Sequence, residues 1–267
     1  MIKIPILMYH DIIGKRSFQP YNGDPIYSIE ESLFAKHLSY TQNIRFKSIS
    51  LADYLRFRYQ ASGVKLLRKS IIFTFDDGHI SNYTLAFPML QDFGFTATFF
   101  VTVKNISSPH GMTWQQLREM AESGMSIQSH TMTHPFLPDL PPERIKWELE
   151  TSKSVLEDKL GESVDFLALP GGRYSSTVRR IAEEVGYQGI CTSKAGYNTL
   201  KTDLYSLRRW TIKGNMDISA FRSIVEMNPL ITLRYRMEYL TLDSLKRILG
   251  NERYIALREK VLRRMKG

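Results

Sequence analysis

Two adjacent carboxylates, Asp76 and Asp77, follow a run of β-branched and aromatic residues at 71–75. Such a run is typical of a strand that is buried on both faces. A turn that leads into Gly78 needs only one Asp, so the second carboxylate is not explained by turn chemistry. A solvated turn is the alternative for this triplet taken alone, and the rest of the sequence has to decide between the two.

Two imidazoles stand four residues apart in another segment, where His130 and His134 follow a second short strand candidate. A helical turn or tight loop would point both rings the same way, and Asp77 would add one carboxylate to them. Three protein ligands leave coordination positions open, as in catalytic metal sites, whereas structural zinc sites are usually closed by four. A metal ion lowers the pKa of its water from ~15.7 toward ~7, and a neighbouring carboxylate can then act as general base. These residues therefore predict metal-assisted hydrolysis.

The elements that would position these residues alternate between strand and helix. Strands are expected at 4–9, 46–49, 71–75, 97–103, 125–128, 164–169 and 189–192. Helices are expected at 51–59, 82–92, 114–123, 141–160 and 176–185, and one more after a capping-box pattern at Ser28 and Glu31. Six or seven strand-then-helix units favour a parallel barrel or open sheet, in which chemistry gathers at the C-terminal ends of the strands.

Composition limits the class of protein. The 267 residues, of which 43% are hydrophobic, suffice for one large α/β domain or two small ones. The single cysteine, Cys191, excludes an intrachain disulfide. No stretch approaches 18 consecutive apolar residues, and the N-terminal segment lacks the pattern of a signal peptide. We therefore expect a cytoplasmic protein, or one that is peripheral on the cytoplasmic membrane face.

The net charge of +9 is unevenly distributed. Residues 233–267 carry ten Lys or Arg and four Asp or Glu, a net charge of +6, with apolar residues at helical intervals. Such a basic tail suits an anionic partner such as membrane lipid, nucleic acid or an acidic glycan, while a solvated helical face is the alternative for any single charge. We expect no nucleic-acid partner, because no recognition-helix, finger or RNP-like motif accompanies the charge. Nothing in the sequence indicates an oligomeric state.

Three motifs resemble the polysaccharide deacetylase family, also called the NodB-homology domain or carbohydrate esterase family 4. They are LMYHDI (7–12), FTFDDG (73–78) and SHTMTH (129–134), and the similarity covers roughly residues 3–215. The resemblance implies an α/β fold, a distorted (β/α)7 barrel. We expect it to form a catalytic domain over 1–232, with the basic helical tail described above at 233–267. The resemblance also implies a metal-dependent hydrolase that removes N-acetyl groups from the amino sugars of a polysaccharide or glycan intermediate.

The resemblance also assigns roles to residues. Asp76 corresponds to the general base, and Asp77, His130 and His134 correspond to the ligands of a divalent metal. Zn is the expected ion, with Co, Ni, Fe and Mn as alternatives. The family's third motif falls at Pro170 and Gly171, where the N–H of Gly171 would hold the oxyanion and Pro170 would line the substrate site.

The chain departs from the family pattern in two places. The third motif lacks the Arg that would orient the base, because the sequence there is ALPGG (168–172). Arg173, Arg208 and Arg209 are the candidates to replace it. The family's late Leu-x-His motif corresponds to YSLRRW (205–210), which has no His to protonate the leaving amine.

Two residues that close the first strand are further candidates for substrate contact. His10 should lie at the barrel mouth, where a role in the site and a role in packing are equally expected. Tyr9 would either stack on a sugar ring or pack in the core. The departures keep two alternative functions open: a metal-containing carbohydrate-binding protein with weak catalysis, or an amidase or deformylase that acts on a lipid-linked sugar.

Overall fold

The computed structural model describes residues 2–14, 25–59 and 67–234, together with Met237, Thr241 and Ser244. Its centre is an eight-stranded sheet whose named strands all pair in parallel, in the order β10-β1-β5-β6-β7-β8-β9, with β4 beside β5. The strands are β1 (Ile6–Tyr9), β4 (Lys47–Ser48), β5 (Ser70–Phe75), β6 (Thr98–Val101), β7 (Ser126–Ser129), β8 (Phe166–Ala168), β9 (Gly189–Cys191) and β10 (Trp210–Thr211).

The sheet curls until its two ends approach each other. Leu207, just before β10, forms a parallel bridge with Cys191 of β9, and Trp210 then pairs with Leu7 of β1. The segment that enters β10 therefore spans the space between β9 and β1. This arrangement is the α/β, distorted barrel expected from the sequence.

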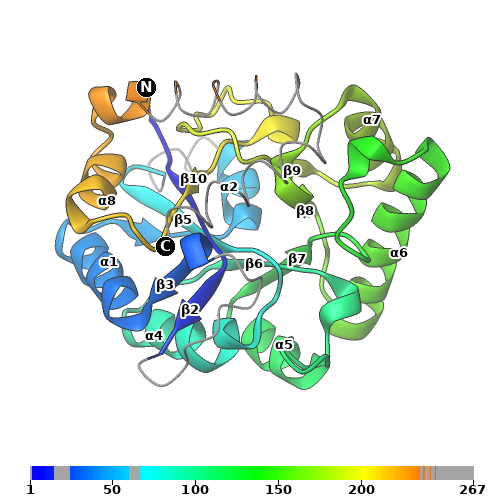
Figure 1. Cartoon of the computed structure of the whole chain (residues 1–267), viewed down its shortest axis with the longest axis horizontal. Coiled ribbons are helices and arrows are strands. Elements are labelled where there is room, and N and C mark those ends of the chain that lie inside the picture. The colour runs from blue at the N-terminus through cyan, green and yellow to red at the C-terminus, as the bar shows by residue number, and fades with distance from the viewer. Residues whose placement is uncertain are drawn as a thin grey trace, which may run out of the picture.

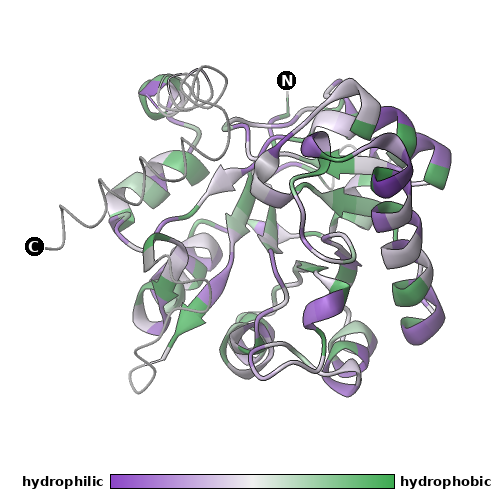
Figure 2. Cartoon of the chain, turned by 45° about the vertical axis from the view of Figure 1, so that its right-hand side comes forward, coloured by the Kyte–Doolittle hydropathy of each residue, from purple (hydrophilic) through white to green (hydrophobic). Residues whose placement is uncertain are grey.

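Helices surround the sheet, as Figure 1 shows. They are α1 (Glu31–Asn43), α2 (Leu51–Arg58), α4 (Phe87–Asp92), α5 (Trp114–Glu122), α6 (Pro142–Leu160), α7 (Ser176–Val185) and α8 (Ile218–Val225). A π-helical turn, η2 (Asn82–Ala86), leads into α4, and β2 (Asp11–Ile13) pairs with β3 (Ser28–Glu30) in a small separate sheet. Figure 2 shows hydrophobic residues gathered in the central strands and hydrophilic ones mainly on the outer helices.

Local sequence signals account for several of these boundaries. All six residues of β5 are buried, as its unbroken apolar run predicts. Thr113 and Gln116 form a capping box at the start of α5, and Gly161 ends α6 with a left-handed φ of 70°. The predicted capping box at Ser28 is wrong. Ser28 lies in β3, where its hydroxyl donates to Asp11, and no side chain caps α1.

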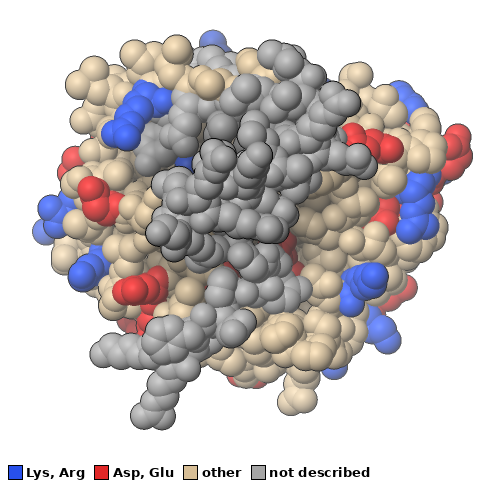
Figure 3. Space-filling model, in the orientation of Figure 1, with Lys and Arg blue, Asp and Glu red and all other residues tan. Residues whose placement is uncertain are grey.

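The surface carries charges of both signs. Figure 3 shows Lys and Arg interspersed with Asp and Glu around the described part of one face. Within the described residues, no helix has the length and apolarity needed to cross a membrane. The predicted basic tail, 233–267, lies almost entirely outside the described residues, so its helical structure stays a prediction.

Candidate metal and catalytic site

Three potential metal ligands converge at the C-terminal ends of β5 and β7. The Nε2 atoms of His130 and His134 each lie 3.3 Å from Oδ1 of Asp77. One ligand atom from each residue lies within 4.8 Å of the others, and within the described residues this is the one group of three or more such side chains. The residues that the sequence placed at two separate strand ends are thus brought together.

The turn after β5 directs Asp77 into this group. Asp77 and Gly78 both have left-handed backbone conformations, with φ of 76° and 77°. A Cβ on Gly78 would lie 2.8 Å from Cγ1 of Val101, so only glycine fits against the neighbouring strand. The tight turn therefore lets the two adjacent carboxylates point in different directions. Asp77 points toward the histidines, and Asp76 points toward a different partner.

The ring of His130 is oriented by the strand beside it. Its Nδ1 lies 2.9 Å from the carbonyl oxygen of Ala168, at the end of β8. A carbonyl can only accept, so Nδ1 is the donor in this bond, and Nε2 is the ring nitrogen that faces Asp77. Metal-binding histidines are commonly fixed in this way by a bond from their other nitrogen.

Asp76 forms a buried ion pair with Arg209, which lies just before β10. Nη1 and Nη2 of Arg209 donate to Oδ1 and Oδ2 of Asp76 at 2.6 and 2.7 Å. Arg209 is fully buried and also donates from Nε to the carbonyl of Thr192. Of the three arginines considered from the sequence, Arg209 is therefore the one that orients the carboxylate predicted to act as base.

The electrostatic surroundings keep both carboxylates charged. Burial alone would raise the pKa of Asp76, but the charges of Arg209 and His130 outweigh it and the pKa falls below its usual value. Burial acts the same way on Asp77, where hydrogen bonds from His130 and His134 prevail and hold the pKa well below its usual range.

The loop after β8 lies beside the metal-ligand loop. Pro170 is buried, and Gly171 is exposed with a φ of 62°. A Cβ on Gly171 would come within 2.8 Å of the ring of Phe136, two residues past His134. Among the described residues, no group accepts a hydrogen bond from the Gly171 N–H. This donor is therefore available to a ligand.

The two residues at the end of β1 take different positions. His10 lies close enough for its charge to lower the pKa values of Asp76 and Asp77, and its buried Nδ1 has no hydrogen-bond partner among the residues that the structure describes. Tyr9 is fully buried, stacks on Phe75 and is hydrogen-bonded to His37. Of the two predictions for Tyr9, the structure supports packing in the core, because no face of its ring is open to a sugar.

The comparisons with known proteins agree with these motifs. A family model described as polysaccharide deacetylase matches residues 63–190. The protein YxkH of Bacillus subtilis (strain 168), whose name places it among the polysaccharide deacetylases, is 30% identical over 224 residues. That match covers 84% of this chain and 76% of the relative. The chain belongs to the polysaccharide deacetylase family.

Solved structures of similar deacetylases share the fold. The Streptococcus pyogenes deacetylase PplD, solved with acetate, has a TM-score of 0.71 and 29% identity, over 81% of this chain and 95% of its own. BC0361, a polysaccharide deacetylase from Bacillus cereus, has a TM-score of 0.73 and 26% identity, over 84% of this chain and 69% of its own. This chain is therefore a polysaccharide N-deacetylase with the NodB-type fold.

The donor set of the deacetylase fits a divalent metal. One carboxylate oxygen and two imidazole nitrogens form an open set of three ligands, which suits Zn and related ions. The bond from His130 to Ala168 supplies the outer support that such a ligand needs.

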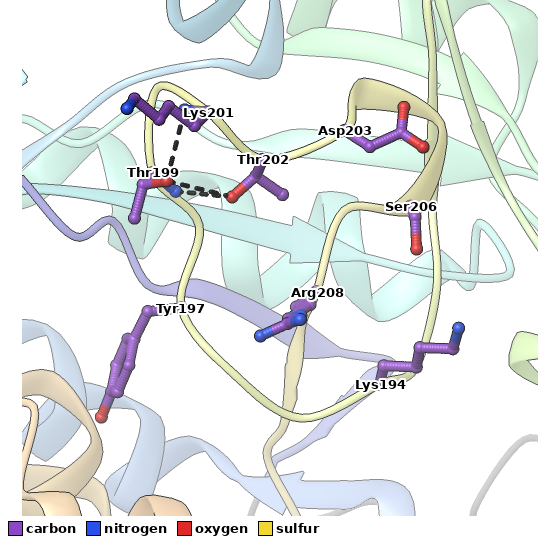
Figure 4. Close-up of a pocket in the computed structure, with 8 residues that line it drawn as sticks. All are labelled: Lys194, Tyr197, Thr199, Lys201, Thr202, Asp203, Ser206 and Arg208. Carbon is purple, nitrogen blue, oxygen red and sulfur yellow. Dashed lines mark hydrogen bonds between the residues drawn. The ribbon is translucent and has the colours of Figure 1, made fainter.

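The deacetylase also has a hollow elsewhere, of about 440 Å³, within the loop between β9 and β10. Figure 4 shows its lining residues, which are Lys194, Tyr197, Thr199, Lys201, Thr202, Asp203, Ser206 and Arg208. Asp203 forms a salt bridge with Arg179. None of the lining residues belongs to the metal-ligand group or to the Asp76–Arg209 pair, so the hollow is distinct from the candidate metal and catalytic site.

Proposed function

We propose that this chain is a metal-dependent hydrolase that removes N-acetyl groups from the amino sugars of a glycan. The observation that carries the proposal is the juxtaposition of an open three-ligand group, Asp77, His130 and His134, with a second buried carboxylate, Asp76, that Arg209 keeps charged. A hydrolase of this kind needs both a metal site and a base, and the two lie on adjacent residues of one turn.

Asp77, His130 and His134 would hold the ion, which we propose to be Zn. A bound divalent ion would polarise the acetyl carbonyl and make a water more acidic. Both histidine rings present Nε2 toward Asp77, and the bond from Nδ1 of His130 to Ala168 leaves the Nε2 of that ring to bind the ion.

Asp76 would accept the proton of the attacking water. Its two oxygens offer about four lone-pair sites, and Arg209 occupies two of them, which leaves acceptor capacity for a water. The bidentate bond fixes the plane of the carboxylate, because a guanidinium fork holds both oxygens at once. Asp76 is thus kept both ionised and oriented.

Gly171 and His10 would act on the two ends of the scissile amide. The N–H of Gly171, which has no acceptor in the described part of the chain, can donate to the oxygen that becomes negative when water attacks the carbonyl. His10, which lies close to both carboxylates, can give a proton to the amine as the carbon–nitrogen bond breaks. This assignment supplies the acid that the late motif lacks, and Pro170 would shape the adjacent wall.

Distant relatives support an N-acetylated glycan as the substrate class. One is named a peptidoglycan N-acetylmuramic acid deacetylase and another a poly-β-1,6-N-acetyl-D-glucosamine N-deacetylase. The matches span 48% and 18% of those relatives. The Asp76–Arg209 pair weakens the case for a binding protein without catalysis, since that case rested partly on the missing arginine.

Acetate release from N-acetylglucosamine oligomers tests the proposal. Protein stripped of metal should be inactive and should regain activity with Zn or Co. Asp77→Ala should lose both metal and activity, whereas Asp76→Asn should retain metal and lose turnover. An Asp76→Asn protein that turns over normally would remove Asp76 from the role of base.

The same assay separates the alternatives. Stoichiometric metal binding and oligomer binding without acetate release would favour a carbohydrate-binding protein. Formate release from an N-formylated, lipid-linked amino sugar, with no acetate release from oligomers, would favour a deformylase.

We propose further that the segment 233–267 makes peripheral contact with an anionic membrane surface, beside a catalytic domain at 1–232. Its net charge of +6 supports this, as does the exposure of Leu230, Leu233 and Met237, three residues at helical spacing. Sedimentation with vesicles that contain anionic lipid should bring down the chain, and a Leu233→Asp variant should bind less. Equal binding to neutral vesicles would contradict an electrostatic contact.

A further inference from the structure

A fully buried acidic residue, Glu148 of α6, contacts the loop between the two histidine ligands. Its Oε2 accepts hydrogen bonds from the backbone N–H of Met132 at 3.0 Å and of Thr133 at 2.8 Å. Its Oε1 accepts from the hydroxyl of Thr133 at 2.5 Å and from Arg144 at 3.4 Å. One side chain thus binds the middle of the loop at three points.

The contacts use Glu148 as an acceptor. N–H groups and a guanidinium can only donate, so both carboxylate oxygens accept hydrogen bonds from these partners. Hydrogen bonds to a charged acceptor are stronger than those between neutral groups. A neutral side chain of the same shape would therefore hold the loop less firmly.

The loop needs such support because its backbone is unfavourable. Thr131 and His134 are both in the left-handed region, with φ of 69° and 63°, which costs free energy for residues other than glycine. Ser152, one helical turn after Glu148, is hydrogen-bonded to Ser129 at the end of β7, and the hydroxyl of Ser129 in turn accepts from the N–H of Thr131. Two buried polar side chains on one face of α6 thus support the loop, Glu148 directly and Ser152 through Ser129.

His134 depends on this support more than His130 does. The His130 N–H is paired with Val101, and its Nδ1 is bonded to Ala168. The side chain of His134 is 40% exposed, and its N–H is bonded to the hydroxyl of Thr131 within the loop itself. The position of its ring is therefore set by the conformation of the loop that Glu148 holds.

We propose that Glu148 is a positioning residue that holds the loop 131–134 in its strained conformation and thereby sets the affinity of the site for its metal. The inference rests on the metal site of the proposed function, and it assigns no contact between Glu148 and the ion or the substrate. Residues that orient metal ligands from outside typically change metal affinity 10- to 100-fold when they are mutated.

The test is a metal titration of Glu148→Gln against a chromophoric chelator. Glutamine keeps the shape of the side chain, removes the charge and turns one oxygen into a donor that faces other donors. We expect Zn affinity to fall about 10- to 100-fold. Glu150→Gln is the matched control, because it removes the same charge from an exposed position on the same helix and should retain the wild-type affinity.

Two further readouts separate positioning from general damage. At saturating Zn the kcat of Glu148→Gln should recover most of the wild-type value, and amide hydrogen exchange should increase in the peptide containing residues 131–134. A general loss of stability would instead raise exchange throughout the core and would not be corrected by metal. Unchanged Zn affinity in Glu148→Gln overturns the proposal.

The experiment distinguishes a failure of the proposed metal site from a failure of the role proposed for Glu148. If wild-type protein binds no metal, the proposed function itself fails, whatever the variants do. If Glu148→Gln does not fold, Thr133→Val takes its place, since it removes the hydroxyl donor of Glu148 and leaves the N–H bonds. That variant should bind Zn several-fold more weakly, and wild-type affinity in it would overturn the proposal.

Discussion

Arg209 donates two parallel hydrogen bonds to Asp76, at 2.6 and 2.7 Å, although the two residues are 133 positions apart in the sequence. Both side chains are buried, and the guanidinium also lies over the ring of Phe100, 5.4 Å from its centroid. The chain therefore obtains from the β10 edge of its sheet the arginine that its third motif lacks.

Replacing Arg209 should affect stability and turnover together. Arg209→Met would leave Asp76 buried without a counter-charge, which typically costs about 3–5 kcal/mol in the free energy of unfolding. Arg209→Lys keeps the charge but loses the fork, so it should fold better and still release acetate slowly. Urea unfolding and acetate release measure the two effects. Arg208→Gln, at the exposed neighbour, is the control and should match wild type in both.

His10→Gln should lower kcat while metal affinity stays the same. General acid catalysis typically contributes about 10²- to 10⁴-fold, so a loss in that range is expected for an amine leaving group. Acetate release with a chromogenic N-acetyl amide whose leaving amine is less basic should suffer less. His110→Gln, at an exposed position, controls for the loss of an imidazole. A His10→Gln enzyme with wild-type kcat would leave the proton donor to another residue.

Gly172→Ala should destabilise the loop after β8. Gly172 has a φ of 67°, and a Cβ there would lie 2.3 Å from Oγ and 2.5 Å from Cβ of Ser193. Backbone strain and overlap together should cost about 2–4 kcal/mol. Gly94→Ala separates the two effects, since Gly94 has a φ of 68° but no atom within 4 Å of the added Cβ. Equal losses of unfolding free energy in the two variants would show that the contact with Ser193 does not matter.

His37 should make the protein lose stability in acid. Burial lowers the pKa of His37 from 6.5 to about 3, so the folded state keeps it neutral where the unfolded chain is protonated. Stability should therefore decline as the pH falls from about 6.5 to about 3, by a few kcal/mol in total. In His37→Gln the slope of unfolding free energy against pH should be shallower over this window. An identical slope in wild type and variant would contradict a neutral, buried His37.

The order of strands and helices could be read from the sequence because each unit carries its own local signals. Continuous apolar runs mark strands such as β5, and Thr113 and Gly161 mark helix ends. The metal-ligand group followed from these units, since parallel strands bring their C-terminal ends to one edge. The capping pattern at Ser28 misled because a tertiary partner, Asp11, takes its hydroxyl.

Other parts of the site could not be predicted from the sequence alone, because they depend on tertiary contacts. The choice of Arg209 over Arg173 and Arg208 required the pairing of β10 with β1, and a two-residue strand leaves no periodicity to detect. The sequence does contain an indication that Glu148 is buried. It shares one face of α6 with Ile145, Leu149 and Leu156, and a charge on an apolar stripe indicates a buried partner.

The place of Arg209 in the chain has a consequence for biosynthesis. On a ribosome, Asp76, Asp77 and both histidines are made long before Arg209 is added. Asp76 therefore has no arginine partner until the segment that carries Arg209 has been made and β10 has paired with β1. The orientation of the proposed base thus depends on the last strand of the sheet to be synthesised.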